Sequence, residues 1–180
     1  DFSHEKFIQN YNGNLANGLG NLVSRVLKMS EMYFNNTVSD VGGDAVPLRE
    51  HMEMVSGKEV RELGTVQNFI NSTILPEYEK AMENYEIHKA SQVIWKLVKI
   101  LDSYVSEYEP FKLIKTDKEK TEGIIFNLLF GLEKISVMLS PFMPDTAEKI
   151  SGLVGRDKDG GMKYHTGTLN APLFARIEKI

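Results

Sequence analysis

The chain has 180 residues, 42% hydrophobic and 26% charged, which is ordinary for one globular domain and unlike a disordered chain. It contains no cysteine, which excludes a disulfide framework, a cysteine nucleophile and a zinc site with cysteine ligands, and is compatible with a cytoplasmic location. The net charge of −4 is opposite to the basic balance typical of nucleic-acid-binding proteins, although a local basic patch does not depend on the overall charge.

The first predicted helix begins at Ser3, which can cap it, and Phe2 can pack against Phe7 one turn later. Glycines at 13, 18 and 20 lower the helix propensity, and we expect a kink or a close helix–helix contact there. Residues 35–57 are rich in Asn and Gly and predict mostly loop. The apolar positions of the first helix recur at helical spacing: Tyr11, Leu15, Leu19, Leu22, Val23, Val26 and Leu27.

Two further helices are predicted in the middle of the chain. The first runs from about Lys58 to Asn84, with inward positions that include Val60, Leu63 and Val66, and we expect Pro76 to bend it. The second runs from about Glu86 to Tyr108, with its inward positions beginning at Ile87, and Pro110 ends it.

A fourth helix is predicted to begin at a capping box formed by Thr116 and Glu119 and to continue to Pro141. A short helix follows from Pro144, and residues 155–180 read as an irregular tail. No pattern predicts a strand ladder. The fold class is therefore all-α: an antiparallel helical bundle over residues 1–154, followed by the tail.

The sequence predicts no membrane span, because its apolar runs are short and interrupted by charge. Its first residues lack the basic and apolar regions of a signal peptide. The absence of an initial methionine indicates a processed chain or a piece of a longer protein.

The sequence does not match the common catalytic motifs. The chain has no phosphate-binding loop and no paired-histidine zinc motif, and its four histidines show no metal-ligand spacing. We therefore predict no catalytic residue and no metal site in this chain.

A polar stripe on the first helix is the stronger signal. At about 100° per residue, Asn14, Gly18, Asn21 and Arg25 lie off the apolar face. Asn21 and Arg25 are four residues apart, so their side chains project together. An amide and a guanidinium at this spacing can read the edge of an unstacked base. The alternative is an ordinary surface pair or a bond to a neighbouring loop.

A second signal is an aromatic residue that follows a proline. Pro110 ends a helix and lets Phe111 project, with Lys112 and Lys115 beside it. An aromatic ring among cations is typical of sites that bind single-stranded bases. The alternatives are a buried anchoring phenylalanine and, for the lysines, a solvated helix face. The wider lysine cluster consists of Lys96, Lys99, Lys112, Lys115, Lys118 and Lys120.

Three segments closely resemble the anticodon-binding domain of class I aminoacyl-tRNA synthetases: YNGNLANGLGNLVSR at 11–25, YEPFKLIK at 108–115 and LSPFMPDTAEKI at 139–150. The ending PLFARIE at 172–178 is similar to the close of the methionyl-tRNA synthetase core. The resemblance covers nearly the whole chain and is weakest over residues 36–57.

The resemblance implies a helical bundle that holds the CAU anticodon loop of methionine tRNA with its bases splayed out. It makes Asn21 and Arg25 candidate readers of the anticodon. Phe111 would stack on the wobble cytosine, at a position where the family normally has tryptophan. Asp102 stands where relatives commonly have asparagine. Candidates for further RNA contacts are Asn14, Lys112 and Lys115.

The resemblance also implies a longer parent enzyme that joins methionine to tRNA with ATP and magnesium, whereas this part would carry no cofactor. Its partners would be tRNA and the catalytic domain of the same chain, with no membrane. The tail would return along the bundle or toward the catalytic domain, packed down by Phe174 and Ile177. Two alternatives stay open: the related domain of a valyl, leucyl, isoleucyl or cysteinyl enzyme, and a helical protein-interaction scaffold.

Overall fold

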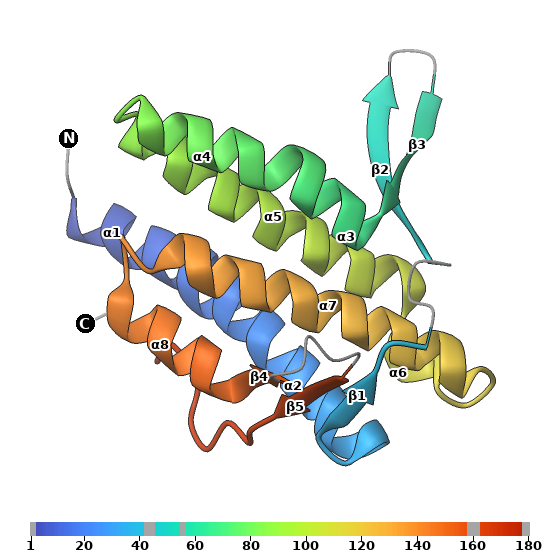
Figure 1. The fold of residues 1–180 in the computed structure, drawn as a ribbon. Helices are drawn as coiled ribbons and strands as arrows, with labels where there is room; N and C mark the ends of the chain where they lie inside the picture. Colours follow the sequence, from blue (N-terminus) through green and yellow to red (C-terminus); the bar gives the residue numbers. More distant parts are fainter. Residues whose placement is uncertain (1–2, 42–45, 55–56, 158–162, 178–180) are drawn as a thin grey trace.

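The computed structural model describes residues 3–41, 46–54, 57–157 and 163–177, and the side chains of these residues except for 50–61. Helices form a bundle around α7, which runs between α5 and α8 (Figure 1). The elements in chain order are α1 His4–Asn10, the π-helix η1 Tyr11–Gly20, α2 Asn21–Phe34, β1 Thr37–Ser39, β2 Pro47–Met54, β3 Gly57–Thr65, α3 Val66–Phe69, the π-helix η3 Ile70–Ile74, α4 Leu75–Glu83, α5 Ile87–Tyr108, α6 Pro110–Leu113, α7 Lys118–Leu139, α8 Pro144–Leu153, β4 Val154–Arg156 and β5 Lys163–Thr166.

The first helical stretch begins as predicted, because the Ser3 hydroxyl accepts a hydrogen bond from the Lys6 N–H at 3.2 Å. Phe2 lies outside the described residues. The glycine-rich part is the π-helix η1, and it ends at a close approach. A Cβ on Gly20 would lie 3.2 Å from the Phe174 ring. The close contact at Gly20 is therefore made with the C-terminal segment around Phe174, which is not helical, and differs from the predicted helix–helix contact.

The expectation of loop followed by helix over residues 35–84 is wrong in its first half. Residues 47–54 and 57–65 are the paired strands β2 and β3, and the helical part starts after Thr65, whose hydroxyl accepts from the Asn68 N–H at 3.1 Å. Arg49 and Glu62 form an ion pair across the ladder, with Nη2 of Arg49 3.4 Å from Oε1 of Glu62. Such cross-strand pairs stabilise a hairpin. The π-helix η3 ends at Ile74, two residues before Pro76, which is the second residue of α4.

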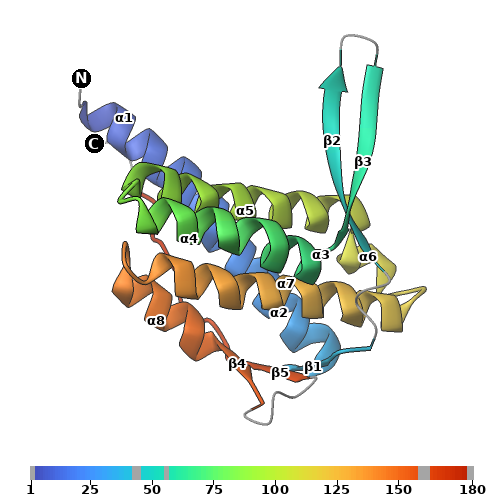
Figure 2. The same cartoon turned by 45° about the horizontal axis from the view of Figure 1, so that its top comes forward.

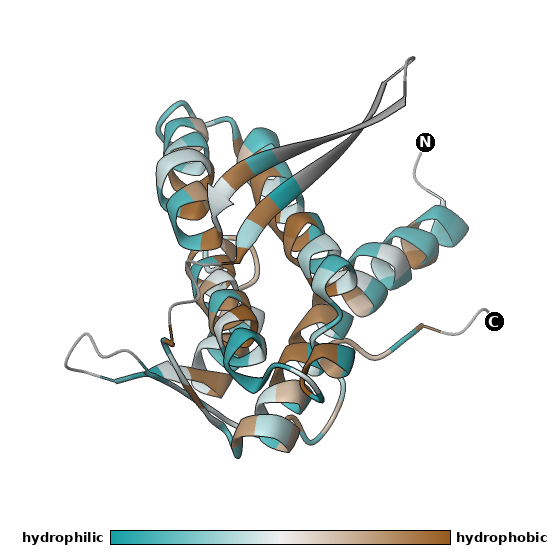
Figure 3. Ribbon diagram, turned by 90° about the vertical axis from the view of Figure 1, so that its right-hand side faces the viewer, coloured by the Kyte–Doolittle hydropathy of each residue, from teal (hydrophilic) through white to brown (hydrophobic). Residues whose placement is uncertain are grey.

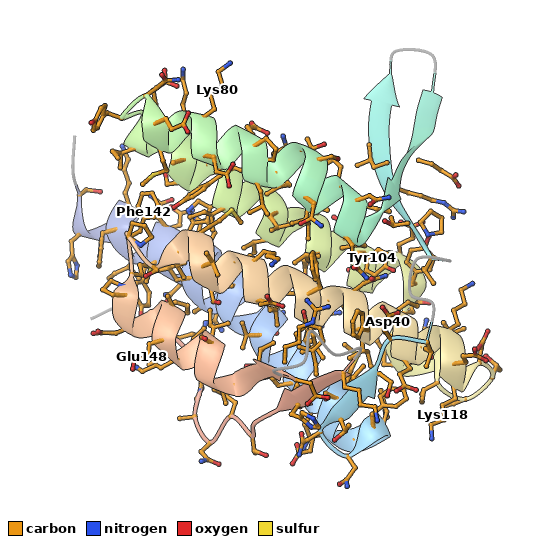
Figure 4. All side chains as sticks on the ribbon, viewed as in Figure 1. Asp40, Lys80, Tyr104, Lys118, Phe142 and Glu148 are labelled. Carbon is orange, nitrogen blue, oxygen red and sulfur yellow. The ribbon has the colours of Figure 1, made fainter. Side chains whose placement is uncertain are left out.

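The hairpin stands away from the bundle (Figure 2), and two tyrosines of α5 are hydrogen-bonded to the chain at its foot. The Tyr104 hydroxyl donates to the Val46 carbonyl at 3.3 Å, and the Tyr108 hydroxyl donates to the Pro47 carbonyl at 2.6 Å. Figure 4 marks Tyr104 near this foot. Burial raises the pKa of the Tyr104 phenol above its ordinary value, so the neutral form that donates this bond is favoured.

The long helices confirm the predicted bundle, and their apolar residues gather on the inward faces (Figure 3). Two details differ. Ile87, expected to face inward, is 52% exposed because it lies in the first turn of α5. The cap of α7 is Asp117, whose Oδ1 accepts from the Lys120 N–H at 2.9 Å, and not Thr116, whose hydroxyl donates back to the Leu113 carbonyl.

The prediction of an irregular tail over residues 155–180, without strands, is wrong in part. β5 pairs antiparallel with both β1 and β4, in the order β1-β5-β4. Tyr164 of β5 is fully buried against Phe126 of α7, and its hydroxyl donates to Glu133. The Ser30 and Thr166 hydroxyls are hydrogen-bonded at 2.8 Å. The small sheet is thereby fixed to α2 and α7.

Gly131 provides a test of the bundle packing. A Cβ there would lie 2.5 Å from Cδ1 of Leu101, which is fully buried on α5. Gly152→Ala in α8 is the control, because a Cβ there meets nothing within 4 Å. Both changes gain helix propensity. We therefore expect Gly131→Ala to lower the free energy of unfolding by about 1–3 kcal/mol relative to the control, through overpacking, in urea denaturation. Equal stabilities would contradict this packing.

Candidate nucleic-acid interface

A pocket of about 650 Å³ lies where α2, α6 and the segment 167–172 meet. More of its surface is apolar than polar. Its charged side chains are Arg25, Lys28 and Glu31, and Lys28 Nζ lies 2.9 Å from Glu31 Oε2. An aromatic and aliphatic pocket with a few polar groups is a shape that accepts a flat heterocycle. The lining residues are Ser24, Arg25, Leu27, Lys28, Met29, Glu31, Met32, Tyr33, Phe111, Gly167, Thr168, Leu169, Asn170, Ala171 and Pro172.

The ring of Phe111 reaches this pocket because the chain turns sharply at the end of α5. Glu109 adopts the left-handed conformation, with φ of 43°, and Pro110 then starts the single helical turn of α6. Phe111 is 41% exposed. The ring is therefore not a buried anchor, and one part of it is free to contact a ligand.

Arg25 is held in place from the opposite helix. Its Nη1 donates to Oδ1 of Asp102 on α5 at 3.0 Å. The side chains of Arg25 and Asp102 are 33% and 49% exposed. This ion pair joins α2 to α5 beside the pocket. Arg25 of the polar stripe and Phe111, the aromatic residue after Pro110, therefore line the same pocket.

Asn21 and Asn14 lie elsewhere. Asn21 is exposed one turn before Arg25 and lines a second, adjoining pocket of about 510 Å³ with Arg176. Ser24 and Pro172 line both pockets, so the two hollows are neighbours. Asn14 is exposed on η1 and lines neither of them.

The lysines do not form one basic patch. Lys112 lies beside Phe111, with Nζ 5.9 Å from the ring centroid, and is also paired with Glu109 at 2.7 Å. Lys115 is exposed just after α6. Lys96 pairs with Glu77 of α4, and Lys118 Nζ lies 5.7 Å from the Phe34 ring. Of the lysines placed here, Lys112 and Lys115 lie at the turn that carries Phe111.

The wall formed by residues 167–172 was not predicted as part of the site. It is held by the segment that follows. The Asn12 side chain donates to the Ile177 carbonyl at 2.8 Å and accepts from the Ile177 N–H at 2.9 Å. Phe174 is buried, and its ring meets that of Tyr11 edge to face. The apolar ending of the chain indicates this docking, but the identity of the wall depends on contacts across the whole chain.

Over the described residues, no group of three or more His, Asp or Glu side chains is placed to hold a metal ion. The described helices also include none that is long and apolar enough to cross a bilayer.

Asn12 tests how the pocket wall is held. Asn12→Ala removes both hydrogen bonds to Ile177, and we expect faster amide exchange at Ile177 while the amides of α7 stay protected. The control is Asn14→Ala, an exposed asparagine on the same π-helix. If amide exchange at Ile177 is unchanged in Asn12→Ala, the two Asn12–Ile177 hydrogen bonds do not hold the pocket wall.

The chain is similar to known proteins over most of its length. Residues 70–166, more than half of the chain, match the model of the family described as the anticodon-binding domain of tRNA ligase. This range includes Asp102 and Phe111. Arg25 lies before it.

The sequence is 33% identical over 99% of this chain to a methionine–tRNA ligase of Fusobacterium nucleatum subsp. nucleatum, and 27% identical over 98% to that of Bacillus subtilis. The chain spans 28% and 26% of the length of these two relatives. The fold matches the apo methionyl-tRNA synthetase of Mycobacterium tuberculosis with a TM-score of 0.72 at 18% identity, covering 99% of this chain and 36% of that one. The chain therefore belongs to the family of anticodon-binding domains of tRNA ligases.

Proposed function

We propose that this chain is the part of a methionine–tRNA ligase that binds the CAU anticodon loop of methionine tRNA. The observation that carries the proposal is that the Arg25 guanidinium and the half-exposed Phe111 ring line one pocket. RNA recognition by sequence targets unstacked loop bases, which are stacked on aromatic rings and read along their edges. The two side chains supply these two functions at one place.

Each group has a role in this proposal. Phe111 stacks on the wobble cytosine, an interaction worth about 1–3 kcal/mol per base. Arg25 donates to acceptor atoms of a base edge through its planar fork. Asn21, in the adjoining pocket, contacts a neighbouring anticodon base. Phosphate contacts come from Lys112 and Lys115, with Asn14 as a further RNA contact, and they position the loop without reading it.

The reaction of the whole enzyme is also part of the proposal. The relatives are named methionine–tRNA ligases, and another structure matched by this fold is the Mycobacterium tuberculosis enzyme in complex with methionyl-adenylate. We infer that the parent protein joins methionine to tRNA in the cytoplasm with ATP and magnesium, through a catalytic domain that this chain does not include. Residues 1–154 would be the binding bundle, and 155–180 would pack back on the bundle or toward that domain.

The proposal is tested by titrating the chain with anticodon stem-loops. We expect the CAU stem-loop to bind more tightly than stem-loops with altered wobble bases, and affinity to fall steeply with salt because of the phosphate contacts. Tighter binding of a valine, leucine, isoleucine or cysteine anticodon would assign the chain to another ligase. A helical protein-interaction scaffold would bind none of them.

Arg25→Ala is expected to weaken binding of the CAU stem-loop by about 1–3 kcal/mol, because the variant loses the contacts of a guanidinium to a base edge. Arg156→Ala is the matched control. Its guanidinium lies 5.5 Å from the Tyr164 ring in the small sheet and lines neither pocket. Isothermal titration calorimetry measures both. An equal loss of affinity in the two variants would show that Arg25 does not read the anticodon.

Phe111→Ala should weaken binding by about 1–3 kcal/mol through loss of stacking, whereas Phe111→Trp should maintain or strengthen it because the indole is the larger ring. Tyr85→Ala removes a more exposed ring, at the turn between α4 and α5, and should leave affinity unchanged. Fluorescence anisotropy with a labelled stem-loop gives the three affinities. A Phe111→Ala variant that loses stability and keeps its affinity would make the ring a packing residue.

A further inference from the structure

We propose that Asp102 is a positioning residue that determines specificity through Arg25. It directs the guanidinium into the base pocket and neutralises its charge, so that Arg25 selects a base edge and does not bind phosphate. This inference rests on the proposed function, and it concerns the choice of cytosine over uracil at the wobble position.

The geometry places the carboxylate where it controls Arg25. Asp102 lies outside the set of residues that line the pocket, while Arg25 belongs to that set. The contact at 3.0 Å joins Asp102 Oδ1 to Nη1 of Arg25, and the two residues belong to different helices, α5 and α2. A pair across two helices links the direction of the side chain to the packing of both helices, whereas a pair within one turn involves one helix alone. The Lys28–Glu31 pair in the same pocket is of the latter kind.

The remaining donors of Arg25 match cytosine. A guanidinium has five N–H donors and no acceptor, and Asp102 uses one of those on Nη1. Cytosine presents two adjacent acceptors, N3 and O2, on its Watson–Crick edge. Uracil places an N–H between its two carbonyls, so a fixed pair of donors meets a donor. A guanidinium held in one direction therefore favours cytosine.

The charge of the pair matters equally. An unpaired arginine beside an anticodon loop is attracted by every phosphate within reach, and phosphate contacts carry no sequence information. Asp102 offsets this charge locally. A base has no net charge and loses little from the compensation, whereas a phosphate loses its main attraction. The ion pair thus shifts the preference of Arg25 from phosphate to base.

The test uses three variants and two readouts, the ratio of affinities for CAU and UAU stem-loops and the slope of log affinity against log salt. Asp102→Asn removes the charge and keeps the size of the side chain. We expect the CAU/UAU ratio to fall about tenfold, and the salt slope to steepen by about 1 because the freed Arg25 gains a phosphate contact. Asp102→Glu retains the carboxylate and should retain both values.

Glu109→Gln is the matched control. It frees Lys112, whose Nζ lies 2.7 Å from Glu109 Oε1, so it also releases a cation beside the loop. It should steepen the salt slope without changing the CAU/UAU ratio. Exposed ion pairs contribute about 1 kcal/mol or less to stability, so these variants should fold.

Four results would overturn the proposal: an unchanged CAU/UAU ratio in Asp102→Asn, an unchanged salt slope in that variant, loss of the ratio in Asp102→Glu, or a fall in the ratio for Glu109→Gln equal to that for Asp102→Asn. Failure of the proposed function looks different. In that case the unchanged chain itself binds none of the stem-loops or binds CAU and UAU equally.

Discussion

The bundle depends on the burial of α7. Its residues 123–132 are all buried, so the helix must be covered on several sides, and α2, α5, α8 and β1 all pack against it. Gly131 allows Leu101 of α5 to approach the α7 backbone closely. With α2 and α5 both pressed against one apolar helix, side chains at their edges meet across the gap. The Arg25–Asp102 contact and the pocket beside it follow from this arrangement.

The periodic parts of the fold could be predicted from the sequence. The helices α5, α7 and α8 and the Ser3 cap follow local rules that act within a few residues. The β2–β3 hairpin could not, because Val60, Leu63 and Val66 also fit a helical spacing and pairing between strands is not visible in a single segment. The small sheet is harder still, since Val38 pairs with Tyr164, far along the chain. The cap of α7 shifted by one residue because Thr116 and Asp117 can both serve.

The same distinction holds for the site. Arg25 and Phe111 were found from helical spacing, from the proline before the ring and from the family resemblance. The structure then placed them in one pocket. Asp102 had no explanation from the sequence, because its partner lies 77 residues away. The pocket wall at 167–172 was missed for the same reason. Asn14 shares the helical stripe but lines neither pocket, since the stripe runs along η1 beyond the end of both.

The central claim is that Arg25 and Phe111 act on the same unpaired base. Nuclear Overhauser effects between the isotope-labelled chain and an unlabelled CAU stem-loop test it most directly. The account predicts that H5 and H6 of the wobble cytosine show contacts to the Phe111 ring. In the same complex, the N4 amino and H1′ protons, which lie beside the N3 and O2 acceptors, should show contacts to the Arg25 side chain. A wobble base that stays stacked within the loop, or that contacts only one of the two side chains, would contradict it.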